Sequence, residues 1–299
     1  MMPKRLLFQL APFAVLLATA ALVVARQREE VSVRIEPVDG NVSVLFGAGG
    51  NIGLLVGPEA VLIVDSQFDW LAPKNEAAIV ELAGRRPTHL VNTHWHGDHT
   101  GGNPALGDGA RIVAHRNVRA RLGALPGTEG RVADPVRPEA LPETTFSDEL
   151  SLHLNGEEVR LVHVPSAHTD GDTVVWFRGS NVVHMGDLYF SETYPFFDVN
   201  SGGSIAGLLA AVESVLEWVP EDARVVPGHG KVTGVAELRT YRDMLDTLVS
   251  RVREALAAGM TADDMLEGRL SEDYDERWGG SSFVPPERFV RMLAEDLAE

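Results

Sequence analysis

The densest group of reactive side chains in this chain is a run of three histidines and one aspartate within six residues: His94, His96, Asp98 and His99. Apolar residues before the run predict a strand, and glycines within and after it predict a turn. Imidazole nitrogen and carboxylate oxygen are ligands that zinc accepts, and a catalytic zinc site takes its ligands from several chain segments. The run therefore indicates a metal site whose other ligands should follow the ends of later strands.

Three later residues stand in such positions. His168 precedes the sequence Thr-Asp-Gly-Asp, Asp187 follows a glycine, and His229 lies between two glycines. A single histidine of this kind is more often a loop residue, but beside the first run both histidines indicate metal ligands. An aspartate after a glycine at a strand end is also a common turn residue, so this alternative stays open for Asp187. The chain contains no cysteine, which leaves nitrogen and oxygen as ligand atoms.

In this order along the chain, and together with Asp65 at the end of the apolar run 62–65, these motifs resemble those of the metallo-β-lactamase fold superfamily. The resemblance extends from about residue 31 to about residue 256. It implies an α/β fold, the four-layer αββα metallo-β-lactamase sandwich, whereas the sequence pattern alone indicates only mixed α and β structure. We therefore assign residues 31–256 to a catalytic domain and residues 257–299 to a C-terminal helical extension, in which we see no chemistry.

The resemblance also implies two zinc ions in each chain. The first ion would be held by three imidazoles, those of His94, His96 and His168. The second would be held by Asp98, His99 and His229, with Asp187 as the carboxylate that bridges both ions. Asp65 resembles a residue that orients the metal-binding loop without binding metal itself.

A site of this kind implies a zinc metallo-hydrolase with a small-molecule substrate. Zinc lowers the pKa of a bound water to about 7, from about 15.7 in bulk, so a metal-bound hydroxide can attack a carbonyl at neutral pH. We expect Asp98 and Asp187 to orient this hydroxide as catalytic residues, in addition to binding metal. The bond cleaved would be an ester, lactone, thioester or lactam.

The substrate is less well determined than the reaction. Members of the largest β-lactamase subclass usually have cysteine at the Asp187 position and a nearby lysine for the substrate carboxylate, but no lysine lies between Lys74 and Lys231. The aspartate is more like that of glyoxalase II and lactonases. A second lactamase subclass keeps the His-x-His-x-Asp-His run, so a β-lactamase proper stays an alternative. A non-catalytic metal-binding or sulfur-oxidation accessory protein is a second alternative, because a ligand set does not establish turnover.

The first 25 residues have the features of a secretory signal peptide. Lys4 and Arg5 precede an apolar run over residues 6–24, and small residues offer a cleavage site. An uncleaved N-terminal membrane anchor is the alternative, because the run is nearly long enough to span a bilayer. Either way we expect a periplasmic or secreted protein. The formal charge of −17 argues against nucleic-acid partners, and the sequence does not indicate an oligomeric state.

Several further features bear on the site. The proline-rich stretch 123–147 predicts a long surface loop, for which a lid is one hypothesis. Hairpins predicted over 151–164 and 173–185 should bring His168 and Asp187 to one edge. Four aromatic residues could wall a substrate pocket, with a tyrosine hydroxyl assisting the carbonyl, or simply pack in the core: Tyr189, Tyr194, Phe196 and Phe197. The remaining histidines of interest are interpreted as structural: His89, His115, His153, His163 and His184.

Overall fold

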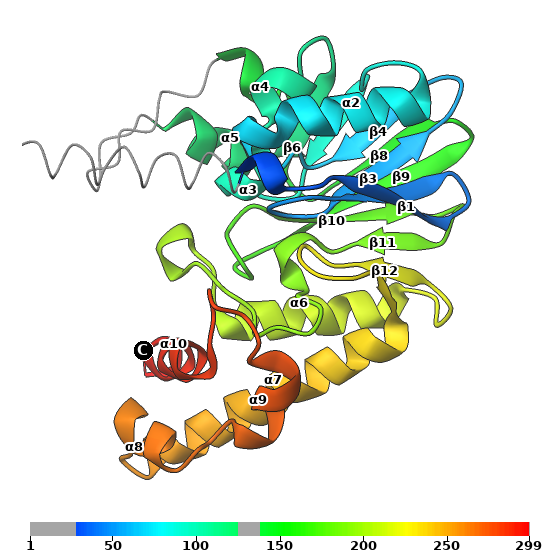
Figure 1. Cartoon of the computed structure of the whole chain (residues 1–299). Helices are drawn as coiled ribbons and strands as arrows, with labels where there is room; N and C mark the ends of the chain where they lie inside the picture. Colours follow the sequence, from blue (N-terminus) through cyan, green and yellow to red (C-terminus); the bar gives the residue numbers. More distant parts are fainter. Residues whose placement is uncertain (1–27, 125–137, 299) are drawn as a thin grey trace, which may run out of the picture.

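Two β-sheets lie face to face at the centre of the molecule, and helices cover the outer side of each sheet (Figure 1). The computed structural model describes residues 28–124 and 138–298. The layers follow one another as helices, sheet, sheet and helices, so the predicted four-layer αββα sandwich is confirmed. The predicted signal segment 1–25 and most of the predicted loop 123–147 lie outside the described residues.

The first sheet has seven strands in sequence order. Its first four strands are an antiparallel meander, and the last three are parallel to the fourth. Apolar β-branched residues dominate these strands, as expected for a buried sheet. The strands are β1 (Arg34–Asp39), β2 (Val42–Phe46), β3 (Ile52–Val56), β4 (Val61–Val64), β5 (His89–Asn92), β6 (Arg111–His115) and β7 (Thr144–Phe146).

The second sheet has six strands in the order β13-β12-β11-β10-β9-β8. They are β8 (Glu149–Leu154), β9 (Glu157–Val164), β10 (Asp172–Phe177), β11 (Val182–His184), β12 (Arg224–Val226) and β13 (Thr233–Gly234). The predicted hairpin between β8 and β9 turns at Asn155 and Gly156, which both have positive φ, at 59° and 75°. Two left-handed residues match the right-handed twist of the flanking strands. Both predicted hairpins are confirmed.

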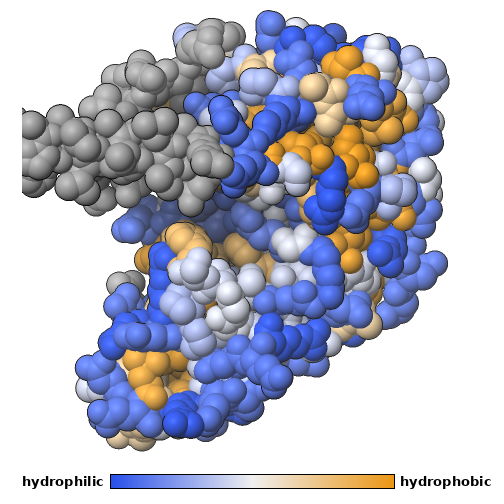
Figure 2. Space-filling model, in the orientation of Figure 1, coloured by the Kyte–Doolittle hydropathy of each residue, from blue (hydrophilic) through white to orange (hydrophobic). Residues whose placement is uncertain are grey.

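The helices fall into two groups. Beside the first sheet lie α2 (Ala72–Ala83), α3 (Gly97–Thr100), α4 (Asn103–Leu106) and α5 (Arg116–Gly123), with the 3-10 turns η1 (Asp69–Leu71) and η2 (Pro138–Ala140). Beside the second sheet lie α6 (Ile205–Trp218), α7 (Val235–Ala257), α8 (Ala262–Glu267), α9 (Glu272–Trp278) and α10 (Pro286–Leu297). Two further 3-10 turns, η3 (Gly186–Leu188) and η4 (Val199–Ser201), follow β11 and precede α6. Figure 2 shows this face hollowed between the two groups.

Apolar side chains form one cluster between the sheets and one on the outer side of each sheet. The cluster on the outer side of the second sheet includes residues of α6 and α7 together with Trp278, Phe289 and Leu293 from the C-terminal residues. The C-terminal helices therefore share a core with the second sheet's helical layer. In the described part of the chain, no helix is both long enough and apolar enough to span a membrane.

Phe289 tests whether the C-terminal helices stabilise the whole fold. Its ring is fully buried and stacks on Tyr194, with ring centroids 4.5 Å apart. We expect Phe289→Ala to lower the free energy of unfolding by about 3–5 kcal/mol, because it leaves a cavity in a shared core. Urea denaturation followed by circular dichroism measures this. Phe283→Ala, at a 57% exposed position, is the control and should cost about 1 kcal/mol or less. A separate early transition for the C-terminal helices would contradict the expectation.

Candidate metal centre

Seven side chains meet where strands of the two sheets end. Four of them follow β5: His94, His96, Asp98 and His99. His168 follows β9, Asp187 follows β11 and His229 follows β12. They form two groups in which the possible ligand atoms lie within 4.8 Å of one another. One group contains His94, His96, His168 and Asp187; the other contains Asp98, His99 and His229. The structure thus brings together all seven residues that the sequence singled out.

Asp187 lies between the two groups. Its Oδ2 is 3.5 Å from His168 Nε2 and 3.9 Å from His94 Nε2. Its Oδ1 is 3.1 Å from His99 Nε2 and 3.4 Å from His229 Nε2. One carboxylate oxygen therefore faces each group, which is the placement that a bridging ligand requires.

Glycines allow the backbone to approach this closely. A Cβ atom at Gly228 would lie 2.0 Å from Asp187 Oδ1, and one at Gly50 would lie 2.1 Å from the His99 ring. Gly186, immediately before Asp187, has a φ of +52°, a left-handed conformation that glycine adopts without strain. The glycines beside Asp187 and His229 thus have a steric role as well as a turn-forming one.

The outer ring nitrogens of two histidines show which inner atoms carry lone pairs. His168 Nδ1 lies 2.8 Å from the carbonyl oxygen of Phe196, and His96 Nε2 lies 3.0 Å from Asp198 Oδ2. A carbonyl or carboxylate oxygen only accepts, so both outer nitrogens donate. In the neutral imidazole the other nitrogen is then an acceptor. His168 Nε2 and His96 Nδ1 thus turn lone pairs toward each other, 2.9 Å apart.

The hydrogen bonds of Asp65 determine which ring nitrogen carries the proton in His94 and His99. Thr93 Oγ1 donates to Asp65 Oδ2 at 2.7 Å, so it accepts from His94 Nδ1 at 3.0 Å. The same carboxylate oxygen accepts from His99 Nδ1 at 2.7 Å, and Asp65 Oδ1 accepts from the Thr93 amide at 2.8 Å. In the neutral rings, which are the forms that bind metal, both Nε2 atoms are therefore acceptors. The structure places Asp65, fully buried, where it orients these two imidazoles.

This donor set fits divalent metal ions. Within the described residues, His94 Nε2 and Asp187 Oδ1 are buried and make no hydrogen bond. Four inward imidazole lone pairs and a carboxylate repel one another unless a cation lies among them. Histidines that bind metals almost always donate their other nitrogen to an oxygen in this way. The described residues thus supply the nitrogen and oxygen ligands that zinc accepts.

The model of the family described as the metallo-beta-lactamase superfamily matches residues 45–229, which include all seven of these side chains. The chain belongs to the metallo-beta-lactamase superfamily.

Two relatives and one solved structure illustrate the similarity. A hydroxyacylglutathione hydrolase of Rhodospirillum rubrum is 31% identical over 230 residues, 72% of this chain and 81% of that protein. A hydroxyacylglutathione hydrolase of Polaromonas sp. is 27% identical over 170 residues, 54% of this chain and only 56% of that protein's length. The crystal structure of DIM-1 metallo-beta-lactamase matches with a TM-score of 0.60 at 22% identity, covering 73% of this chain and 99% of that chain. The structural match shows the fold, and the family match shows the superfamily.

Burial and neighbouring charges shift the pKa values of the metal-site residues, some upward and some downward. Burial lowers the pKa of His168 to about 4 and holds that of His94 well below its usual value. Burial would also lower the pKa of His229, but the carboxylates of Asp187 and Asp98 raise it to about 9. Burial would raise the pKa of Asp187, but the protons that His99 and His229 carry in the absence of metal hold it well below its usual range, and a metal ion would take the place of those protons. The carboxylates therefore stay ionised and available to a cation.

Asp198 is a site residue that the sequence analysis missed. Besides facing His96, its Oδ2 accepts from Ser201 Oγ at 2.5 Å. Burial alone would raise its pKa, but the hydrogen bonds from His96 and Ser201 lower it to about 2. No local pattern marks this residue, because it lies 102 positions after His96 in a loop before α6. Only the tertiary structure joins them.

The tyrosines do not assist the site. Tyr189 and Tyr194 are both 1% exposed, and their hydroxyls are hydrogen-bonded to Thr233 and Asp275, at 3.2 Å and 2.8 Å. The expectation of a tyrosine hydroxyl at the carbonyl is wrong, and the alternative of core packing explains both residues. Phe196 does border the site, with its ring centroid 6.3 Å from that of His96.

Two histidines outside the metal centre join the sheets. His115 of β6 and His163 of β9 stack with ring centroids 3.6 Å apart and planes 5° apart. Burial lowers the pKa of His115 to about 4, assisted by the charge of His163, and burial likewise lowers the pKa of His163. The stack therefore persists as a neutral pair. His184 is also structural, since its Nε2 donates to the Asn51 carbonyl at 3.1 Å.

Asp198→Asn tests the outer partner of His96. We expect divalent-metal affinity to fall by about tenfold or more, because the neutral amide makes His96 a weaker ligand. Competition with a zinc-binding dye measures this. Asp148→Asn, at an exposed position, is the matched control and should leave the affinity unchanged. Equal affinities for the Asp198 variant and the wild type would contradict the expectation.

The stacked pair predicts a loss of stability in acid. The pKa of His115 is about 6.5 in an unfolded chain and about 4 in the fold, so the unfolded state takes up the proton first. Stability should fall as the pH drops from about 6.5 toward 4, by about 1–2 kcal/mol after allowance for solvent screening. Urea unfolding at pH 7.5 and 5.0 with a chelator present measures this. His115→Gln should lose less stability between the two pH values than wild type or the exposed control His153→Gln.

Proposed function

We propose that this superfamily hydrolase is a dinuclear zinc enzyme that cleaves an ester or thioester bond of a small molecule. The observation that carries the proposal is the placement of Asp187, with one oxygen toward each group of inward-facing ligands. Two groups that share a carboxylate indicate two ions rather than one. The choice of zinc rests on the donor set, which contains only imidazole and carboxylate.

The residues of the metal site have different roles in the proposed reaction. When bound, zinc supplies a Lewis acid for the carbonyl and a nucleophile from water at neutral pH. His94, His99 and His168 are buried at the base of the site, whereas His96, Asp98 and His229 are 17%, 28% and 30% exposed. Substrate and water therefore reach the site past these three more exposed side chains. Asp98 and Asp187 accept hydrogen bonds from the attacking water and so orient it toward the carbonyl.

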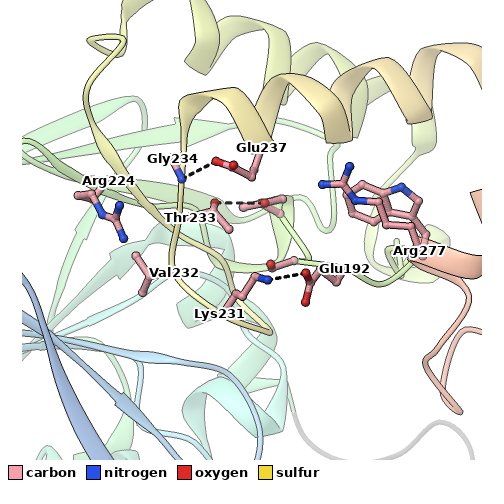
Figure 3. Close-up of a pocket in the computed structure, with 11 residues that line it drawn as sticks. Glu192, Arg224, Lys231, Val232, Thr233, Gly234, Glu237 and Arg277 are labelled. Atoms are coloured by element: carbon pink, nitrogen blue, oxygen red, sulfur yellow. Dashed lines mark hydrogen bonds and ion pairs between the residues drawn. The ribbon is translucent and has the colours of Figure 1, made fainter.

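Thioesters and esters are favoured over lactams for two reasons. Two relatives carry the name hydroxyacylglutathione hydrolase, which describes a thioester substrate. The nearest lysine after His229 is Lys231, which is 64% exposed and paired with Glu192 at 2.5 Å. Figure 3 shows this pair on the wall of a separate pocket of about 340 Å³, which Arg224 and Arg277 also line. A lysine engaged in this way is poorly placed to hold a lactam carboxylate.

Metal analysis and a substrate panel test the proposal together. The purified protein should contain two zinc ions per chain by mass spectrometry, and it should hydrolyse thioesters and esters faster than nitrocefin. A chelator should abolish turnover, and zinc should restore it. His168→Ala should lower kcat/KM by more than about 100-fold, beyond what loss of an outer partner costs. His153→Ala, an exposed histidine on β8, is the control.

Each unexpected result of these tests would exclude a different part of the proposal. Full activity in the presence of the chelator excludes a metal-dependent reaction. Two bound zinc ions without turnover of any substrate indicate the accessory protein that the sequence left as an alternative, and rapid nitrocefin hydrolysis alone indicates a β-lactamase. We also propose export to the periplasm or medium, from the sequence of residues 1–25. Fractionation that finds the protein in the cytoplasm would refute this.

A further inference from the structure

A groove of about 520 Å³ lies beside the metal centre, between the loop that precedes α6 and the C-terminal helix α10. The loop contributes Phe196, Asp198 and Val199, and the C-terminal residues contribute Arg288 and Met292. These two segments are far apart in the sequence, and both line the groove. The C-terminal residues, in which the sequence showed no chemistry, thus form one wall of a groove.

Two side chains that line the groove also contact histidines of the metal centre. Asp198 lines the groove and bonds to His96 through its Oδ2. Phe196 lines it as well, and its ring centroid is 6.0 Å from that of His168 and 6.3 Å from that of His96. The groove therefore lies on the outer side of His96 and His168, and a substrate whose carbonyl is at the metal centre would reach it past the edge of His96, which is 17% exposed.

The groove carries apolar surface that is exposed to water. In the described part of the chain, four large apolar side chains are more than a third exposed: Leu82, Val199, Met260 and Phe283. Single exposed apolar residues are ordinary, but Val199 lines the groove and Phe283, 57% exposed, packs against Phe196 at its rim. Binding sites for small molecules are concave and mostly apolar.

Arg288 holds the aromatic rim in place. Its guanidinium carbon lies 4.4 Å from the Phe283 ring centroid and 5.3 Å from that of Phe196, and its Nη1 donates to the Phe283 carbonyl. The cation and the two rings pack against one another, and the two ring centroids are 5.4 Å apart. Phe283 is thus positioned at the rim although much of its ring remains open to solvent.

The charges around the groove argue against an ionic ligand. Glu287 is paired with Arg291, and Asp198 with His96 and Ser201, so these acids have partners within the fold. Arg288 and Arg291 also line the groove, but Arg288 packs on the rings of Phe283 and Phe196, and Arg291 is paired with Asp263 and Glu287. Glu295 adds a further exposed carboxylate to the groove wall. These acids would repel an anionic group, and a neutral apolar group avoids the repulsion.

We propose that this groove binds a neutral apolar acyl or aryl part of the substrate, and that Phe283 and Val199 set the preference for its length. The inference rests on the proposed function, since it concerns the substrate of the same metal centre. It makes the C-terminal helices a determinant of specificity in addition to their part in the core.

A series of 4-nitrophenyl esters tests this on the zinc-loaded full chain. In wild type, kcat/KM should rise from acetate through butanoate to octanoate, by about two- to fourfold for each methylene that the groove buries. Phe283→Ala should lower the octanoate-to-acetate ratio of kcat/KM by about five- to tenfold, chiefly through KM, because the ring that covers the chain is lost. Phe283→Leu should restore part of the ratio.

Leu82→Ala is the matched control, because Leu82 is 48% exposed on α2 and lies outside the groove. It should leave the ratio unchanged. Val199→Ser, which removes exposed apolar surface from the opposite wall, should lower the ratio in the same direction as Phe283→Ala. A ratio that stays at the wild-type value in both groove variants would overturn the inference.

Binding gives a readout independent of turnover. Calorimetric titration of the zinc-loaded protein with octanoate and with acetate should show tighter binding of octanoate. This preference should shrink in Phe283→Ala but persist in Leu82→Ala. If ester hydrolysis is absent but the calorimetric preference follows Phe283, the proposed function fails and the groove stands. If all esters are hydrolysed with no dependence on Phe283, the groove fails and the proposed function stands.

Discussion

The repulsion between inward-facing ligands is the constraint around which this structure is arranged. His96 and His168 turn lone pairs toward each other across 2.9 Å, and His94 and His99 add two more beside the Asp187 carboxylate. In water such groups would separate or take up protons. The two sheets prevent this because they hold the ligand-bearing loops at neighbouring strand ends. The energy of the packed core thus keeps a cation site assembled.

Two carboxylates that do not bind metal orient the metal-binding imidazoles. Asp65 orients His94, through Thr93, and His99 from the first sheet, and Asp198 orients His96 from the loop before α6. Each fixes which nitrogen carries the proton, and this decides whether the ring presents a lone pair to a metal. The buried Asp65 is surrounded by the first sheet, whereas the position of Asp198 depends on the loop that the C-terminal helices support.

The C-terminal residues therefore matter to the site through packing. Tyr194 stacks on Phe289 of α10 and bonds to Asp275 of α9, which holds the loop that continues to Phe196 and Asp198. The same contacts remove Tyr194 from any role at the carbonyl. They also bring α10 against the loop so that a groove opens between them. The helices that stabilise the core thus also form one wall of the groove.

Local spacing in the sequence by itself determined the metal-binding run, the two strand-end histidines and most strands, whereas the four-layer fold and the role of Asp187 came from the resemblance to a known family. A histidine at a strand end or an Asn-Gly turn is visible in a few neighbouring residues. Only the tertiary structure decided the tautomers, the partner of His96, the burial of Tyr189 and Tyr194, and the groove at α10. Those depend on contacts between segments 28 to 102 positions apart, and no local pattern records which distant side chain completes a hydrogen bond.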